Sequence, residues 1–172
     1  MLALEAVLAR AGSDEASRLL AVNRFFNERI VFREDLVVWG RLDYWASPLE
    51  LLARGEGDCE DYAIAKYFSL RAAGVPASRL RLAYTQARIG RAVLAHMVLA
   101  YYADARVVDP LVLDNLNPEL LTAAQRPDLA ARFSFNSEGV WEGLGARSLG
   151  DPLRRLPDWR QLLLKAEAEG FR

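Results

Sequence analysis

The spacing of apolar side chains predicts two long helices in the first half of the chain. Ser13 can cap a helix, and beyond it apolar residues recur about every 3.6 positions, so we expect a helix from about 14 to 29. Apolar side chains cover most of the circumference of segment 59–73, which predicts a buried central helix ending before the sequence GVP. Segment 33–46 has no clear period and is interpreted as a loop rich in aromatic residues.

A short helix is predicted between that loop and the central helix. Ser47 is a helix-capping residue type, Pro48 suits the first helical position, and Glu50 can complete a capping box with Ser47. Gly55 can end this helix, because glycine adopts the left-handed conformation at little cost. All four residues agree on one short helix.

The second half of the chain has the alternation typical of β-strands. Segment 80–86 alternates apolar and polar residues, and segment 92–102 is apolar on both faces, as expected of a central strand. The few residues between them indicate an antiparallel hairpin. We expect further strands within 107–116, where Pro110 interrupts the pattern, and at 132–136.

A helix over about 157–170 is predicted to close the chain. Helices followed by a meander of strands is the order of an α+β fold. The sequence has no internal repeat, low-complexity tract or linker, so we expect one domain spanning 1–172.

The composition of the 172 residues excludes two classes of protein. The formal net charge is -1, whereas nucleic-acid-binding proteins normally carry a basic excess, so we expect no nucleic-acid partner. No stretch reaches the roughly 18 uninterrupted apolar residues of a membrane span, so we expect no membrane insertion. Segment 1–20 lacks the features of a signal peptide, which leaves either a cytoplasmic protein or one trimmed of its leader.

The single cysteine and the single histidine are the candidate reactive groups. Cys59 is expected in the first turn of the buried helix, where exposed N–H groups and the helix dipole stabilise a thiolate. His96 lies mid-strand, and Asp114 lies on the strand expected beside it. A nucleophile, a base and an acid that orients the base are the components of a Cys-His-Asp triad.

The choice of acid depends on strand pairing. If the two strands pair antiparallel around a turn near Asp104, position 96 falls opposite about 112, and Asp114 shares a face with His96 one diagonal away. Asp109 then falls on the opposite face. A bulge at Pro110 would reverse this parity, so Asp109 is the weaker candidate.

Simpler interpretations compete with the triad. A lone cysteine in a long chain is most often an inert buried residue, and a lone histidine in an apolar strand is often a hydrogen-bonded core residue. No metal-binding spacing such as CxxC or HExxH occurs, so catalytic zinc is not expected. Cys59 also has negatively charged neighbours, which disfavour a thiolate. These neighbours are Glu56, Asp58, Glu60 and Asp61.

Several longer motifs carry a resemblance to a known family. The chain closely resembles the bacterial transglutaminase-like cysteine proteases of the LapG type over roughly residues 14 to 142. The motifs that carry it are WGRLDYWASPLELLARGEGDCEDYAIAKYFSLRAAGVP (39–76), AHMVLAYY (95–102), PLVLDNL (110–116), RPDL (126–129) and FSFN (133–136).

The resemblance implies a fold and a set of catalytic residues. The fold would be papain/transglutaminase-like α+β, with the catalytic cysteine at the N-terminus of a buried helix packed on an antiparallel sheet. The triad of the family corresponds to Cys59, His96 and Asp114, which agrees with the residues chosen above. The backbone N–H of Cys59 is expected in the oxyanion hole.

The resemblance also implies calcium, which would account for the acidic residues around the thiol. A hard divalent cation takes several oxygen ligands, often carboxylates. The family assignment gives Asp58, Glu60 and Asp61 as ligands, and Glu56 is expected to be solvated. Bound calcium would cancel charge near the thiol and fix the loop before the helix.

The biological setting is likewise an implication of the resemblance. Such proteases are periplasmic endopeptidases, normally made with a leader that this chain lacks. They cut a large surface adhesin near its N-terminus at a site containing Ala-Ala, which releases the adhesin and disperses biofilm. An inner-membrane receptor of cyclic di-GMP sequesters the protease, and we expect segment 44–48 to be the contact.

Two other functions use the same residues. An acyl-transferring transglutaminase would pass the thioester to an amine instead of water. A calcium-stabilised binding module would keep the fold without catalysis. The aromatic residues Trp39, Tyr44 and Trp45 are expected either to line a substrate groove or to pack in the core.

Overall fold

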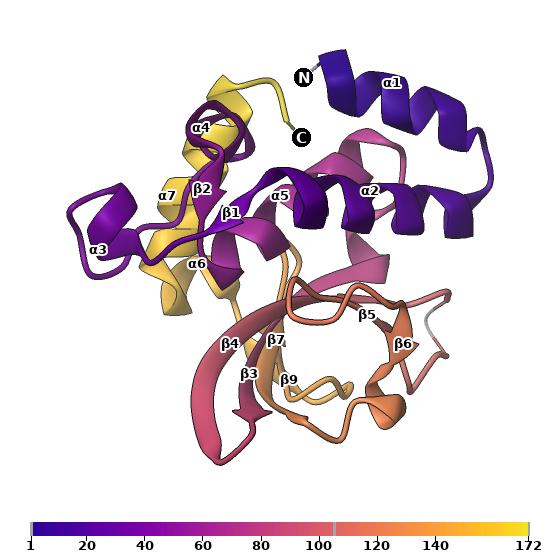
Figure 1. The fold of residues 1–172 in the computed structure, drawn as a ribbon. Helices are drawn as coiled ribbons and strands as arrows, with labels where there is room; N and C mark the ends of the chain where they lie inside the picture. The colour runs from indigo at the N-terminus through magenta and orange to yellow at the C-terminus, as the bar shows by residue number, and fades with distance from the viewer. Residues whose placement is uncertain (1, 105, 172) are drawn as a thin grey trace.

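A seven-stranded antiparallel sheet and a group of helices make up the computed structural model, which describes residues 2–104 and 106–171 (Figure 1). The strand order is β6-β5-β4-β3-β7-β8-β9. A separate parallel pair joins β1 and β2. The strands are β1 (Val31–Phe32), β2 (Glu56–Gly57), β3 (Leu80–Ile89), β4 (Ala92–Tyr101), β5 (Leu111–Leu113), β6 (Leu121–Thr122), β7 (Leu129–Phe135), β8 (Val140–Glu142) and β9 (Ser148–Gly150).

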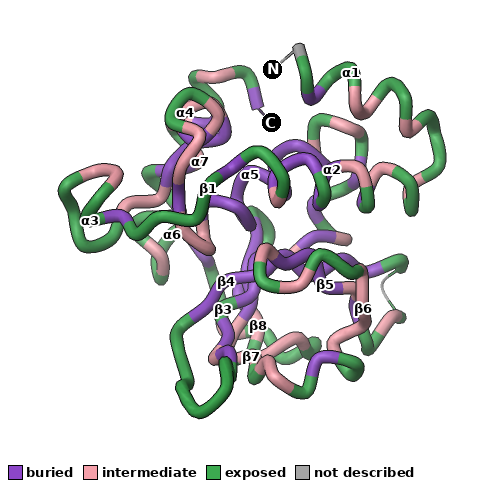
Figure 2. Tube along the Cα trace, viewed as in Figure 1, coloured by how far each residue is buried: buried purple, intermediate pink, exposed green. Residues whose placement is uncertain are grey.

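Helix α5 lies at the centre of the molecule and is buried for most of its length (Figure 2). It packs on β4 and β3 on one side and on α2 and α4 on the other. Among the described residues, no helix has the length and apolar character needed to cross a membrane. The helices are α1 (Leu2–Ala11), α2 (Glu15–Arg29), α3 (Asp35–Val38), α4 (Pro48–Arg54), α5 (Cys59–Ala72), α6 (Pro152–Arg155) and α7 (Pro157–Ala168), with short 3-10 turns η1 (Ala77–Arg79) and η2 (Ala123–Gln125).

The helices predicted from local signals are confirmed. The capping box of Ser47 and Glu50 is formed at the start of α4, and Gly55 ends that helix with a left-handed φ of 71°. The cap of α2 differs from the prediction, because Asp14 rather than Ser13 accepts the hydrogen bond from the backbone N–H of Ser17. The segment predicted as loop contains the short helix α3.

The predicted β3–β4 hairpin is confirmed, and β3 extends three residues beyond the expected 80–86. The two strands run to a tight turn at Gly90, whose φ of 62° favours glycine. In the next pair, Val112 lies opposite Ala100, so the predicted pairing of position 112 with His96 is wrong. Continuing the observed register places Asp114 opposite position 98. Because residues two apart share a face, the predicted parity of His96 and Asp114 nevertheless holds.

Helix α7 covers the outer side of the core. The Trp159 side chain is fully buried, and its ring lies 5.6 Å from that of Tyr67 and 5.9 Å from that of Phe68, both on α5. The Nζ of Lys165 donates to the backbone oxygen of Trp45 at 2.7 Å. The C-terminal helix therefore fixes both α5 and the loop that precedes α4.

Candidate active site

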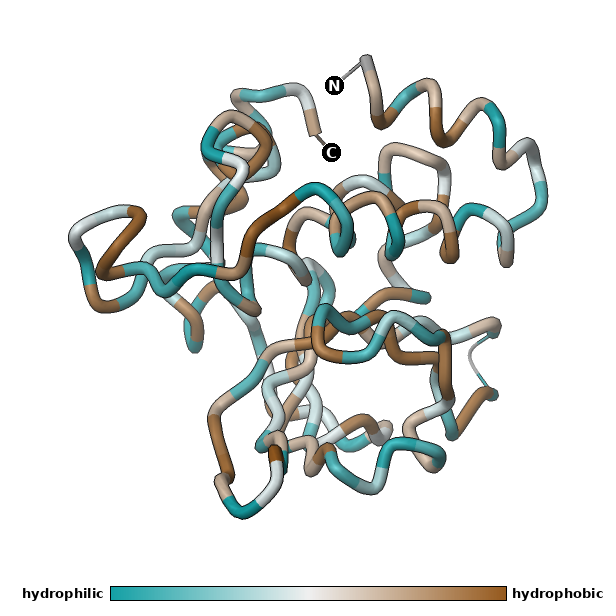
Figure 3. Tube along the Cα trace, in the orientation of Figure 1, coloured by the Kyte–Doolittle hydropathy of each residue, from teal (hydrophilic) through white to brown (hydrophobic). Residues whose placement is uncertain are grey.

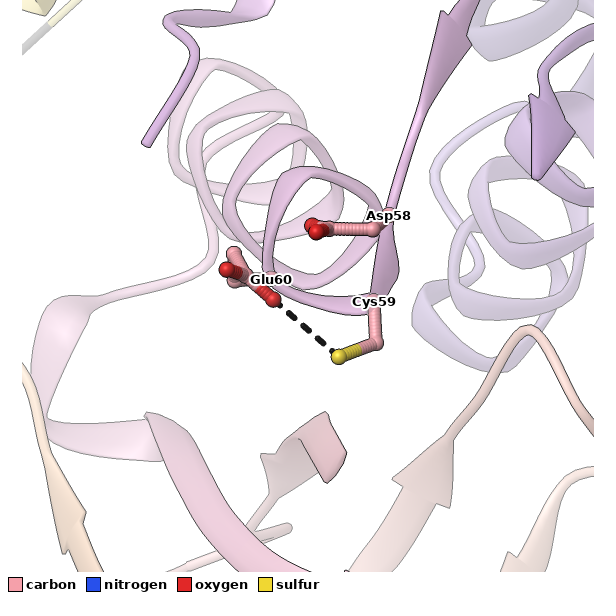
Figure 4. A group of neighbouring side chains, drawn as sticks. All are labelled: Asp58, Cys59 and Glu60. Atoms are coloured by element: carbon pink, nitrogen blue, oxygen red, sulfur yellow. Dashed lines mark hydrogen bonds between the residues drawn. The ribbon is translucent and has the colours of Figure 1, made fainter. Parts of the chain in front are cut away.

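Cys59 is the first residue of α5 and is half-buried. Its thiol donates a hydrogen bond to Oε2 of Glu60 at 3.1 Å (Figure 4). Burial and the charge of Glu60 raise the pKa of the Cys59 thiol above its usual value, and the backbone N–H of Met97 opposes them. When no cation lies nearby, the Cys59 thiol is therefore protonated at neutral pH.

His96 and Asp114 form a buried pair beside the thiol. The Nε2 of His96 lies 2.7 Å from Oδ1 of Asp114, and their relative exposures are 4% and 1%. His96 and Cys59 both line one cavity of about 460 Å³. Because Nε2 is engaged by the carboxylate, Nδ1 is the ring nitrogen left to exchange a proton.

Asp114 is held as a carboxylate by several donors. Burial by itself would raise its pKa, but the hydrogen bond and charge of His96, the backbone N–H of Leu116 and the Arg126 guanidinium together lower the pKa to about 2. The Nη2 of Arg126 lies 2.7 Å from Oδ2 of Asp114. Asp109, the alternative acid, is exposed and accepts from the backbone N–H of Ala124. The structure thus pairs His96 with Asp114 and not with Asp109.

A second set of contacts holds the backbone of Asp114. The Nδ2 of Asn27, on α2, donates to the Asp114 carbonyl oxygen at 2.7 Å. The Nζ of Lys66, on α5, donates to Oδ1 of Asn27 at 2.8 Å. Burial lowers the pKa of Lys66 to about 7, while the charge of Asp114 acts in the opposite direction. These contacts tie the helix of Cys59 to the loop of Asp114.

Arg126, Asn27 and Lys66 were not predicted as site residues. Arg126 begins the RPDL motif, whose role was not evident from the sequence. Lys66 had a detectable signal, since a lysine in a helix predicted to be buried all round requires a polar partner. Asn27 had none, because its role depends on how α2 packs against α5.

Replacing Arg126 with methionine is expected to destabilise the protein by roughly 3–5 kcal/mol, because the buried carboxylate of Asp114 loses a charged partner. Urea unfolding at pH 7 measures the effect. The pKa of Asp114 is lowered on folding, so its contribution to stability is present above its unfolded pKa of about 3.9 and is lost as pH falls toward about 2. The difference between the variant and the wild type should therefore shrink below about pH 4.

The matched control for this variant is Arg147→Met. Arg147 pairs with Glu142 at 2.9 Å, but the two side chains are 76% and 56% exposed. An exposed pair contributes roughly 0–1 kcal/mol, so this variant should unfold nearly as the wild type does. Equal destabilisation by the two substitutions would contradict the role assigned to Arg126.

An acidic cluster lies next to the thiol, and its members Asp58 and Glu60 line the same cavity as Cys59. Carboxylate oxygens of Asp35, Asp58 and Asp61 lie within 4.8 Å of one another, as do those of Asp35, Asp43 and Glu60. Of the three acids predicted from the sequence, Asp58 and Asp61 share one group with Asp35, whereas Glu60 belongs to the group of Asp35 and Asp43. Asp35 and Asp43 complete the cluster and were missed, because they come from α3 and the following loop.

The carboxylates of this cluster lack enough donors. One buried oxygen each of Asp35, Asp58 and Asp61 has no hydrogen-bond partner among the described residues. Burial, followed by the charge of Glu60, raises the pKa of Asp58 to about 9. Burial likewise raises the pKa of Asp61 to about 8 and that of Asp35 to about 6, although backbone N–H groups oppose it in both. Within the described residues, no nearby cation offsets the burial of these three carboxylates.

Gly57 allows the chain to pass close to this cluster. A Cβ atom at this position would lie 2.5 Å from Oδ2 of Asp61 and 2.6 Å from Cδ1 of Leu51. Glu56, just before it, lies apart from the cluster in a partly exposed pair with Arg33 at 3.4 Å. A side chain at position 57 would displace the very oxygen that has no partner.

The three aromatic residues of the preceding loop have different roles. Trp45 lines the cavity that contains Cys59 and His96. Trp39 and Tyr44 instead pack against each other, with ring centroids 4.5 Å apart. The groove interpretation thus fits Trp45, and the packing interpretation fits the other two.

Comparison with known proteins places this site in a family. The family model of the bacterial transglutaminase-like cysteine proteinases (BTLCP) matches residues 3–148. The chain belongs to this family of cysteine proteinases. The predicted family and α+β fold are therefore confirmed. Curated proteins gave no match to this cysteine proteinase.

Solved structures include similar cysteine proteinases from Legionella pneumophila. EGTA-treated LapG is 38% identical, with a TM-score of 0.81, and the match covers 95% of this chain and 86% of that one. Calcium-bound LapG is 37% identical, with a TM-score of 0.79, and the match covers 95% of this chain and 87% of that one. The fold and nearly the whole length are thus shared with LapG.

Proposed function

We propose that this protein is a calcium-dependent cysteine endopeptidase of the periplasm that uses a Cys59-His96-Asp114 triad. The observation that carries the proposal is the cavity shared by Cys59 and His96, with His96 held by a buried carboxylate. A binding module with a vestigial triad would not need the buried donors Arg126 and Asn27, which hold the carboxylate and the backbone of Asp114.

The proposed reaction starts at the thiol. Nδ1 of His96 accepts the proton of Cys59, and the thiolate attacks the carbonyl carbon of the scissile peptide bond. The backbone N–H of Cys59, at the N-terminus of α5, stabilises the resulting oxyanion. His96 then protonates the leaving amine, and water hydrolyses the thioester. Asp114 keeps the imidazole in the required tautomer and stabilises its charged form.

The acidic cluster fits a calcium ion. It offers only oxygen donors, three of its buried oxygens lack partners, and burial disfavours its charges. Asp35, Asp58 and Asp61 would hold the ion, with Glu60 and Asp43 beside them. When bound, calcium supplies positive charge that offsets these carboxylates. Glu60 also accepts from the thiol, so its charge bears directly on the nucleophile. The calcium-bound LapG structure supports the assignment.

The proposed substrate is a large surface adhesin, cut near its N-terminus at a site containing Ala-Ala. Its release would disperse biofilm. The proposed regulator is an inner-membrane receptor of cyclic di-GMP that sequesters the protease. The expected contact over segment 44–48 is narrowed to its first two residues, because Ala46, Ser47 and Pro48 are buried and only Tyr44 and Trp45 are partly exposed. Trp45 lines the cavity of Cys59, so a partner bound to it would cover the entrance of that cavity. These assignments rest on the family resemblance.

Incubation with the N-terminal region of a co-encoded adhesin tests the function. We expect one cut, visible on a gel and placed by mass spectrometry beside Ala-Ala. A labelled amine added to the same reaction should not be incorporated, because water is the acceptor. An intact adhesin fragment in the presence of calcium would refute the proposal, and amine incorporation into glutamine would replace it with a transglutaminase.

A further inference from the structure

The outer edge of β4 is open beside the active site. Strand β4 pairs with β3 along its whole length, from Ala92 to Tyr101. On its other side it pairs with β5 only over Leu99, Ala100 and Tyr101. Residues 92–98 therefore have no strand along that edge within the described part of the chain.

The direction of the backbone groups on this edge follows from one hydrogen bond. The N–H of Tyr102 donates to the carbonyl oxygen of Arg79, on the β3 side, at 2.8 Å. Backbone groups of successive residues in an antiparallel pair point alternately to the two sides of the strand. The backbone N–H and C=O groups of even-numbered residues in β4 therefore point toward β3. The N–H and C=O groups of Val93, Ala95 and Met97 point to the open edge.

The open edge leads to the nucleophile. The N–H of Met97 faces the Cys59 sulfur and Ala95 precedes His96, and these residues line the same cavity. From Val93 to Met97 the edge spans four residue steps of about 3.3 Å, or roughly 13 Å. A chain paired along this edge would run directly to the reactive atoms.

The surroundings of this edge are exposed and apolar. The far half of the hairpin projects from the body of the protein, and it is exposed in Figure 2 and partly hydrophobic in Figure 3. Val93 is 57% exposed and Leu94 is 53% exposed. Across the cavity, Phe32 and Leu42 are also exposed. Natural proteins usually protect such an edge with prolines, bulges or charges, so an unprotected one indicates a partner strand.

We propose that the substrate is recognised as an extended strand whose backbone pairs with the open edge of β4 at Val93 and Ala95. This inference rests on the proposed endopeptidase function and specifies how its substrate binds. Backbone pairing selects any flexible, extended segment. A folded domain has no free backbone to pair in this way. The substrate class is therefore an unfolded, extended segment such as a linker.

A peptide scan tests the pairing. Ten-residue peptides spanning the bond mapped in the adhesin fragment are made with one backbone N-methyl group at each position in turn, and they compete with cleavage of the fragment. Alternate N–H groups of a paired strand face the edge. We expect inhibition to weaken about tenfold at alternate positions, as for the loss of one good hydrogen bond, and to change little at those between.

A variant of the enzyme tests the same edge. Ala95→Pro removes the N–H that faces outward, and proline is tolerated where a strand edge faces solvent. We expect KM to rise at least tenfold, while the rate of Cys59 alkylation by iodoacetamide and the melting temperature stay near those of the wild type. Ala103→Pro, in the exposed segment after β4, is the control and should cleave normally.

The outcomes separate the two proposals. An intact adhesin fragment with the wild-type enzyme would remove the proposed function and this inference with it. Cleavage by the wild type combined with a scan that shows no two-residue period would overturn the pairing alone. Normal KM for folded Ala95→Pro would do the same. A two-residue period together with a raised KM supports strand pairing.

Discussion

Replacing Cys59 with alanine is expected to abolish cleavage of the adhesin fragment while leaving the fold intact. Cys59 is the only cysteine of the chain, so no other thiol can form the thioester. Alanine suits the start of a helix and fills less space than the thiol. His96→Ala should be nearly as damaging, because members of a triad act as a unit and a single loss often costs on the order of 10^4 in kcat. Initial rates on gels, with circular dichroism to check folding, measure both effects.

The acid of the triad has an internal control. Asp114→Asn should lower kcat strongly, since the carboxylate charge beside His96 is lost. Asp109→Asn should leave kcat unchanged, because that side chain is exposed and caps a turn at Ala124. The opposite pattern, with Asp109 required and Asp114 dispensable, would show that the third residue is wrong. Near-normal cleavage by Cys59→Ala would refute the mechanism altogether.

Removal of calcium is expected to lower the melting temperature and stop cleavage. A ligand that binds only the native state stabilises it by about 2.7 kcal/mol at a hundredfold excess over its Kd. EGTA removes this contribution and leaves the clustered carboxylates without a counter-charge. Added calcium should restore both properties. Magnesium should restore them poorly, because it is smaller and requires a stricter octahedral shell. Thermal melts and gels on metal-stripped protein provide the measurements.

The pH dependence of the melting temperature of the metal-free protein provides a second test of the acidic cluster. The pKa values of Asp58 and Asp61 are raised by folding, to about 9 and about 8, so protonation favours the folded state. Their contribution is fully present below an unfolded pKa of about 3.9 and is lost as pH rises toward 8 or 9. Metal-free protein should therefore melt at a higher temperature at pH 5 than at pH 7.5. Calcium should reduce or reverse this difference.

Single substitutions distinguish the acids of the cluster from a neighbouring acid outside it. Asp58→Ala and Asp35→Ala should make cleavage insensitive to added calcium and nearly absent, although neither residue takes part in the proposed proton transfers. Glu56→Gln is the control, since Glu56 lies outside the cluster and pairs with Arg33. Full, calcium-responsive activity in both alanine variants would mean that the acids form only a charged helix start.

Features that depend on residues close together in the sequence were predicted, and features that depend on contacts between distant segments were missed. The ends of α4 were predicted because a capping box and a left-handed glycine act within a few residues. Asp114 was placed on the same strand face as His96 although the register was wrong by several residues, because strand faces depend only on parity. Asp35, Asn27 and Arg126 join the site through packing between distant segments. No local pattern in a single sequence encodes such contacts.

The position of α7 has a consequence for how the enzyme is made. A ribosome synthesises the nucleophile helix α5 and all the strands before it reaches α7. Until then, Tyr67 and Phe68 have no Trp159 to cover them, and the loop at Trp45 lacks the ammonium group of Lys165. Assembly of the catalytic cavity therefore waits for the last helix. A chain that ends before α7 is therefore expected to leave Trp45, which lines the cavity of Cys59, without this anchor.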